Sequence, residues 1–267
     1  MWRDQKNRDW NAVTMTLPKL LFELSGSTRL EILHALETAP LTFTKIVDRM
    51  KITSSEASRQ IERLSGMNLI EKRATGNYAI TPLGVLMLSF LPGIDFVHKN
   101  HDFFLAHDTA PIPHELVMRF GDLSGATFIK GTIEAMNFMQ ERLRNVERYH
   151  CGMVDGLIDS IIPMVVERAK SGVTFRAILP ETYREKISMV MDGYRTADAT
   201  MPPHIIEIRT LPIVPICGAV TDRGGGFKLP FTDGSMDHST MVVGDDPLFC
   251  RWCRDLYTHY WARADPI

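Results

Sequence analysis

Short hydroxyl side chains and arginines gather near the N-terminus in the stretch KITSSEASRQIERL, residues 51–64. Thr53 is followed three residues later by Glu56, a capping-box spacing that predicts a helix running to about Gly66. The polar face of this helix carries Ser54, Ser55, Ser58, Arg59 and, on its flank, Arg63. Hydroxyls can bond phosphates and base edges, and an arginine can bond O6 and N7 of guanine together. The set therefore suits the major groove of double-stranded DNA, with the helix N-terminus adding partial positive charge.

A basic hairpin is predicted directly after this helix, in LIEKRATGNYAI. Thr75, Gly76 and Asn77 supply a tight turn between two short strands. Lys72 and Arg73 would project from it toward the phosphate backbone or the minor groove. The charge balance points the same way, since residues 1–90 carry 12 Lys and Arg against 9 Asp and Glu, and the remainder carries 18 against 23. An excess this small indicates that tight DNA binding depends on two copies of the chain.

Two further helices must position these side chains. One is predicted from Ser27 to before Pro40, with leucines at helical spacing, and a short one is capped by Thr42. Thr81 before Pro82 begins another after the hairpin. The order of these elements resembles the winged helix-turn-helix of arsenic-repressor-type regulators, with the resemblance carried by RLEILHAL, SSEASRQIERLSGMNLIEKR and YAITPLG. The resemblance implies that this head binds double-stranded DNA.

The remainder of the chain predicts an α/β domain. Proline and glycine bracket residues 91–112, which are expected to form a helical linker, with helices at about 83–90 and 95–107. The resulting division is a winged helix-turn-helix head of the α+β class over 1–90, the linker, and a regulatory domain over 113–267. Strands and helices alternate in that domain, so a mostly parallel sheet is expected. The predicted helices span 132–146, 156–171, 181–193 and 247–262, and the predicted strands span 149–154, 173–180, 204–211, 216–222, 227–231 and 239–245.

Composition excludes several classes of protein. Hydrophobic residues make up 45% and charged residues 23% of 267 residues, as in ordinary globular domains. No apolar run is long enough to span a bilayer, and the charged opening MWRDQKNRDW is no secretory signal. Four cysteines in this length make no disulfide framework. The sequence thus predicts a cytoplasmic protein with reduced thiols and no membrane partner.

The whole chain also resembles a group of archaeal regulators from methanogens. That resemblance is carried by RYHCGMVDGLIDSIIPMVVERAKSGVTFRAIL, KLPFTDGSMD and FCRWCRDLYTHYWARA. It implies an archaeal origin and a second domain that acts as a sensor. Related sugar-responsive regulators have a second domain similar to half of the phospholipase D fold. His238, Thr240 and Asp245 match the spacing of that family's catalytic pattern, but Thr240 stands where its charged lysine belongs, so the resemblance implies a non-catalytic domain.

Other residues are candidates for sensing. A small ligand is expected near Arg223, Lys228, Asp233 and His238. Cys250 and Cys253 form a Cys-x-x-Cys whose thiols share a helix face, which leaves a thiol switch open beside simple burial in a core. His98, His101 and His107 are interpreted as a polar helix face or a dimer contact rather than a metal cluster.

The sequence therefore favours a homodimeric, DNA-binding transcription regulator with a small-molecule effector, no cofactor, no metal and no catalytic residues. Two alternatives stay open at this point. One is a phospholipase D-like phosphodiesterase tethered to DNA by its head. The other is a repressor that senses metal or thiol redox state.

Overall fold

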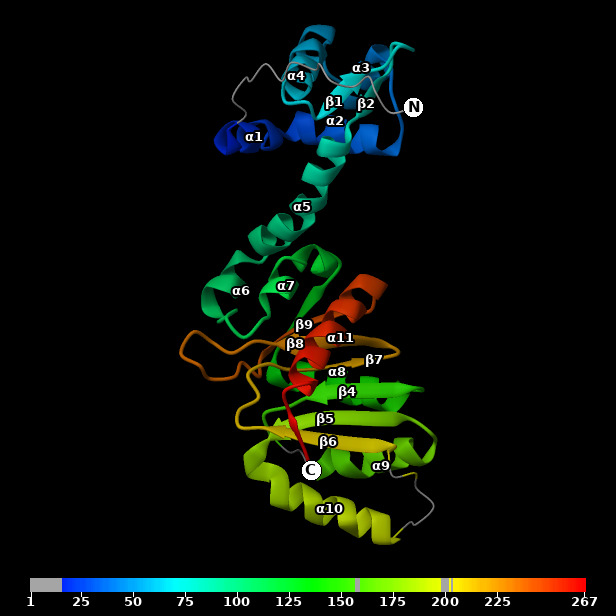
Figure 1. Cartoon of the computed structure of the whole chain (residues 1–267), viewed down its shortest axis with the longest axis vertical. Helices are drawn as coiled ribbons and strands as arrows, with labels where there is room; N and C mark the ends of the chain where they lie inside the picture. Colours follow the sequence, from blue (N-terminus) through cyan, green and yellow to red (C-terminus); the bar gives the residue numbers. More distant parts are fainter. Residues whose placement is uncertain (1–15, 157–158, 198–201, 203) are drawn as a thin grey trace, which may run out of the picture. The chain divides into compact units, whose positions relative to one another are not determined.

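The computed structural model describes residues 16–156, 159–197, 202 and 204–267, and these form two units. The first unit extends to Leu91 and the second begins at Pro92. Figure 1 labels the elements of both units along the chain.

The first unit is a helical head with a two-stranded hairpin. Its elements are α1 (Leu17–Leu24), α2 (Ser27–Thr38), α3 (Phe43–Met50), α4 (Ser54–Gly66), β1 (Ile70–Lys72), β2 (Tyr78–Ile80) and the start of α5 (Pro82–Lys99). Apolar side chains from α1, α2, α3, α4 and α5 meet in one core, with Ile32, Leu33 and Leu64 wholly buried. The predicted caps are confirmed, because the hydroxyls of Thr42 and Thr53 accept from the backbone N–H groups of Lys45 and Glu56.

The helix after the hairpin differs from the expectation of two separate helices at 83–90 and 95–107. One helix, α5, runs through Pro92 to Lys99, and a short α6 (His101–Ala106) follows. Proline removes one backbone donor and strains the turn before it, yet it does not end a helix whose apolar face is anchored on both sides. Leu88 is buried in the head core before Pro92, and Phe96 is buried in the core of the second unit after it.

The second unit contains an eight-stranded sheet in the order β10-β6-β5-β4-β7-β8-β9-β3. The strands are β3 (Thr127–Lys130), β4 (Tyr149–Met153), β5 (Thr174–Pro180), β6 (Ile206–Leu211), β7 (Cys217–Thr221), β8 (Gly224–Lys228), β9 (Thr240–Gly244) and β10 (Asp265–Pro266). The helices are α7 (His114–Val117), α8 (Thr132–Asn145), α9 (Ile162–Lys170), α10 (Arg184–Ala197) and α11 (Pro247–Trp261), with short 3₁₀ turns at Phe120–Leu123, Asp159–Ile161 and Glu181–Tyr183.

The prediction of a mostly parallel sheet is wrong. Among the described strands only the β4–β5 and β5–β6 neighbours are parallel, and the other neighbouring pairs are antiparallel. The cause lies in the connections, because α9 and α10 carry the chain across between the parallel strands. No helix separates β7, β8 and β9, and strands joined by hairpins or loops pair antiparallel.

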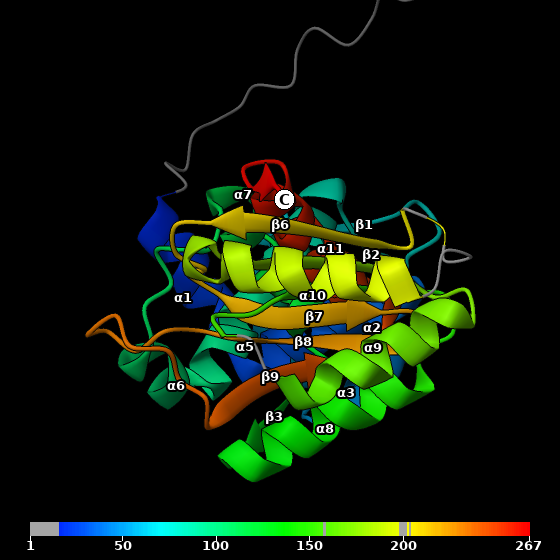
Figure 2. The ribbon, with the colours of Figure 1, turned by 90° about the horizontal axis from the view of Figure 1, so that it is seen from below.

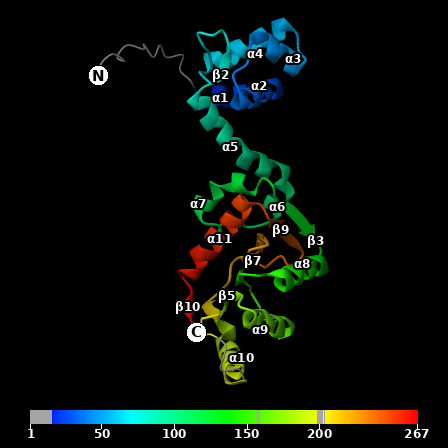
Figure 3. The same ribbon diagram turned by 90° about the vertical axis from the view of Figure 1, so that its right-hand side faces the viewer.

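Helices cover both faces of this sheet, as Figures 2 and 3 show: α11 lies on one face, and α8, α9 and α10 lie on the other. The α11 face holds one continuous core, in which Trp252 and Phe249 are fully buried. The opposite face holds two separate clusters, one around Val166 and Phe175 and one around Ala135 and Met241. Within the described part of the chain, no helix is long and apolar enough to cross a membrane.

Candidate nucleic-acid interface

The N-terminal turns of α4 present the polar face that the sequence predicted. The Thr53 hydroxyl accepts from the backbone N–H of Glu56 at 3.2 Å, which fixes where the helix begins. The side chains of Ser54, Ser55 and Ser58 are exposed. Arg59 is 66% exposed and donates to the Glu56 carboxylate one turn earlier. This pair holds the guanidinium on the helix surface, and an exposed pair of this kind is weak enough to exchange for another acceptor.

Arg63 lies on the same helix but is already bonded inside the head. Its Nε and Nη2 donate to the two carboxylate oxygens of Glu23, at 2.8 and 3.0 Å, and its guanidinium lies over the ring of Phe22. The hydrogen bond to Glu23 raises the pKa of Arg63. The prediction that Arg63 contacts DNA stays a prediction, and the structure shows that α1 holds this side chain.

Glu23 and Arg29 complete that network, and sequence reasoning missed both. Glu23 is 6% exposed and Arg29 is 7% exposed. The Arg29 Nε lies 3.1 Å from the Glu23 carboxylate, and its Nη1 donates to Gln60 of α4 at 2.8 Å. The buried carboxylate thus joins α1 to α2 and α4.

The hairpin of β1 and β2 forms the wing. The backbone N–H of Arg73 donates to the Asn77 carbonyl at 2.8 Å, and that of Gly76 donates to Arg73 at 2.9 Å. Gly76 has φ +85°, a conformation that favours glycine. Lys72 and Arg73 are exposed, and the Lys72 ammonium lies over the ring of Tyr78. The wing therefore offers two cations on a pinned turn, suited to phosphates.

The four residues predicted near a ligand do not all meet. Lys228 and His238 lie together, because the Lys228 ammonium donates to the His238 carbonyl at 3.3 Å. Asp233 instead accepts from the hydroxyl and backbone N–H of Ser235 in its own turn, which lowers its pKa. Arg223 belongs to a separate polar network.

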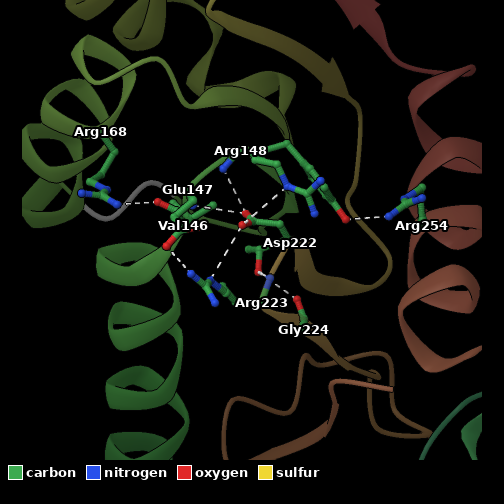
Figure 4. A network of polar contacts seen from close by, with 10 residues as sticks. Val146, Glu147, Arg148, Arg168, Asp222, Arg223, Gly224 and Arg254 are labelled. Carbon is green, nitrogen blue, oxygen red and sulfur yellow. Dashed lines mark hydrogen bonds and ion pairs between the residues drawn. The ribbon is translucent and has the colours of Figure 1, made fainter. Parts of the chain in front are cut away.

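That network ties the β7–β8 turn to the end of α8 (Figure 4). Arg223 pairs with Glu147, and Asp222 accepts from the backbone N–H groups of Glu147 and Arg148 at 3.3 and 3.2 Å. Burial raises the pKa of Asp222, but these backbone donors outweigh it and lower the pKa overall. These contacts fix the turn, and Arg223 also lines a polar cavity together with Arg142, Arg144 and Arg168.

The residues behind the alternative functions have their own partners. His238 Nε2 lies 3.2 Å from Asp155, which follows β4 by two residues, while Thr240 begins β9 and Asp245 is exposed just after it. In the described residues no group of three or more His, Cys, Asp and Glu could hold a metal ion. His107, unlike the exposed His98 and His101, is buried and bonded to Asp237 at 3.0 Å.

The two thiols of the Cys-x-x-Cys are free, with Cys253 buried and Cys250 half-buried. Burial raises the pKa of both. A raised pKa disfavours the thiolate, which is the reactive form of cysteine. The structure therefore gives these thiols a packing role in α11.

Comparison with known proteins places the head in a recognised class. Residues 26–72 match the family described as bacterial regulatory protein, arsR family, and form its helix-turn-helix DNA-binding domain. None of the curated proteins compared with the chain matches it.

Among solved structures, the chain is similar to TrmBL2, an archaeal chromatin protein, at 15% identity and a TM-score of 0.43, covering 91% of this chain and 94% of that one. An IclR homolog from Microbacterium sp. strain HM58-2 is 11% identical, with a TM-score of 0.25 and coverages of 90% and 94%. The riboflavin-derivative dimethyltransferase RosA from Streptomyces davawensis is 13% identical, with a TM-score of 0.27, covering 73% of this chain and 63% of that chain.

Proposed function

We propose that this chain is a transcription regulator that binds double-stranded DNA as a homodimer and answers to a small effector held by its second unit. The observation that carries the DNA-binding part is the capped N-terminus of α4, with Ser54, Ser55, Ser58 and Arg59 exposed on one face. These turns would lie in the major groove, and Lys72 and Arg73 of the wing would contact phosphates on the flank. Regulation rather than catalysis is proposed because Thr240 stands where the phospholipase D pattern has a lysine, and a threonine brings no charge to neutralise a phosphate.

The DNA-binding part is tested on fragments captured from host genomic DNA by the purified chain. Fluorescence anisotropy across a salt series then measures the affinity for the best fragment. Arg59→Ala should weaken binding by about 1–3 kcal/mol and relax preference at one base position, and Lys72→Ala should lower the salt slope by about 1. Lys130→Ala, an exposed lysine of β3, serves as the control. The proposal would be contradicted if the chain showed no salt-dependent DNA binding, or if all three variants lost the same amount of DNA affinity.

The homodimer is proposed from an apolar stripe on α5. Leu86 and Phe90 lie one helical turn apart and are 51% and 50% exposed, and Val85, next to Leu86, is 44% exposed. In the same unit, Leu17 and Leu21 of α1 are 65% and 52% exposed. Contiguous exposed apolar side chains mark interaction surfaces, and two copies would place two α4 helices on half-sites about one DNA turn apart.

Light scattering after size exclusion tests the stripe. Phe90→Asp should shift the chain from dimer to monomer, since it places a charge in an apolar interface. Ile213→Asp, at a side chain 77% exposed outside the head, is the matched control and should leave the mass unchanged. A monomeric wild-type chain, or a dimer that survives Phe90→Asp, would refute this interface.

A further inference from the structure

Two adjoining cavities lie on the face of the sheet that α8, α9 and α10 cover. One has a volume of about 490 Å³ and the other of about 140 Å³. Both cavities are lined by the same five residues, His150, Gly152, Val154, Gly156 and Ile161. The two cavities therefore meet along these residues and together make one elongated space. Its size falls within the range of cavities that hold small ligands.

Small side chains on the central strands produce this space. Successive residues of a strand point to opposite faces of a sheet. On the α11 face the central strands carry Met153, Val220 and Phe227, which belong to the continuous core. On the cavity face the same sheet carries Gly152, Cys217, Ala219 and Ala177. These residues leave a gap between the two apolar clusters of that face.

The space has an apolar body and one polar end. The larger cavity is lined from α8 by Met136, Met139 and Leu143, and the smaller one by apolar side chains of α9, α10, β5 and β6. Lys228 ends β8 directly opposite Cys217, which begins β7, and His238 lies beside it. From β8 to β6 the space crosses four strand spacings of about 4.8 Å, or about 19 Å.

One lysine and one carboxylate lie at the polar end, Lys228 and Asp155. Asp155 is the one carboxylate among the described residues that line the cavities, and it pairs with His238 at 3.2 Å. Lys228 is half-buried, and within the described chain its ammonium bonds a carbonyl and forms no ion pair. Deeper in, burial lowers the pKa of His150 to about 4, so its imidazole adds no charge at neutral pH. A partly buried ammonium without a counter-ion favours an anion.

We propose that this space binds one elongated aliphatic carboxylate, with its carboxylate on Lys228 and its chain lying across Gly152 beneath α8 and α9. A single ammonium matches a single negative charge, and the apolar walls match an unbranched chain. That such a ligand alters DNA affinity rests on the function proposed above, whereas its binding does not.

Calorimetric titration of the full chain with decanoate, decanol and decylamine, below micellar concentrations, tests the assignment. These probes share a chain and differ in the headgroup. Decanoate should bind one molecule per chain and about tenfold to a hundredfold tighter than decanol, the gain of a charge-assisted hydrogen bond. Decylamine should bind no better than decanol. Failure of decanoate to bind, or equal binding of the amine, would overturn the proposal.

Two variants test the contact with the ligand's headgroup and the contact with its hydrocarbon tail separately. Lys228→Met should bring decanoate down to the affinity of decanol, and Lys130→Met is the matched control that should change nothing. Met139→Trp should narrow the larger cavity and weaken the binding of decanoate, with a cooperative melting transition showing that the variant folds. Unaltered decanoate affinity in both Lys228→Met and Met139→Trp would overturn the site.

DNA anisotropy without decanoate distinguishes the two proposals. Lys228→Met should bind DNA as the wild-type chain does. If the protein binds decanoate but no DNA, the proposed function is refuted and the ligand site is supported. If it binds DNA but not decanoate, the ligand site is refuted and the DNA-binding function is supported.

Discussion

Replacing Glu23 by Gln tests whether the buried ion cluster holds the head together. Glu23→Gln keeps the shape of the side chain and removes its charge. Arg29, 7% exposed, would then keep its bonds to Gln60 and to the Phe22 carbonyl but lose its counter-ion. Arg63 would lose the two-point acceptor that it has on α1.

The magnitude follows from the burial of Arg29. Removing one partner of a buried ion pair costs about 3–5 kcal/mol, because the remaining charge is left without compensation. Since whole domains are stable by about 5–15 kcal/mol, this is a large fraction of the stability of the head. At about 1.4 kcal/mol per factor of ten, amides protected by folding of the head should exchange some hundred to several thousand times faster.

Hydrogen exchange measured by mass spectrometry on the full chain resolves peptides of the head from those of the second unit. Glu31→Gln, at an exposed glutamate of α2, is the control and should change stability by less than about 0.5 kcal/mol. Glu23→Gln combined with Arg29→Met should exchange more slowly than Glu23→Gln alone, since the uncompensated charge is gone. If Glu23→Gln exchanges like Glu31→Gln, the cluster does not stabilise the head and our reasoning is refuted.

Three further predictions follow from groups described above. Arg63→Met should leave the salt slope of DNA binding unchanged, because the guanidinium of Arg63 is hydrogen-bonded to Glu23. A slope lowered by about 1 would instead show that Arg63 contacts a phosphate. His150→Gln should flatten the pH dependence of stability between about pH 6.5 and pH 4. Burial keeps the imidazole of the folded chain neutral while that of the unfolded chain binds a proton, so the wild-type chain loses stability as the pH falls through this range. Equal changes in the free energy of unfolding with pH in both proteins would contradict this. Cys253 should resist thiol reagents at pH 8 until denaturant is added, since burial raises its pKa. Rapid labelling of Cys253 in the folded chain would contradict this and would support a redox-sensing role for the thiol.

Local signals predicted the head well. The Thr53–Glu56 spacing places the start of α4 correctly because a cap is decided by residues three apart. The turn before Gly76 is likewise decided locally, by the backbone conformation that glycine tolerates. The helices over 132–146 and 247–262 are confirmed as α8 and α11, since long apolar periodicity leaves little choice.

Contacts between distant residues were not predicted. Glu23 and Arg63 are 40 residues apart, and helical spacing places Arg63 on a flank without saying what faces it. The sheet is mostly antiparallel because no helix lies between β6, β7, β8 and β9, so the parallel pairing expected from alternating strands and helices is limited to β4, β5 and β6. The cavity depends on the register, since only the pairing of β4 with β7 brings Gly152 beside Ala219 on one face.

The core beneath α8 and α9 is divided, so a ligand bound there would stabilise the folded chain. A face with two apolar clusters and a gap between them is less cohesive than the continuous core on the α11 side. A molecule that fills the gap and binds only the folded chain adds RT ln(1 + [L]/Kd) to the free energy of unfolding, about 2.7 kcal/mol at a hundred times Kd. Because proteolysis follows the population of opened chains, ligand supply would also set how long each copy of the protein survives.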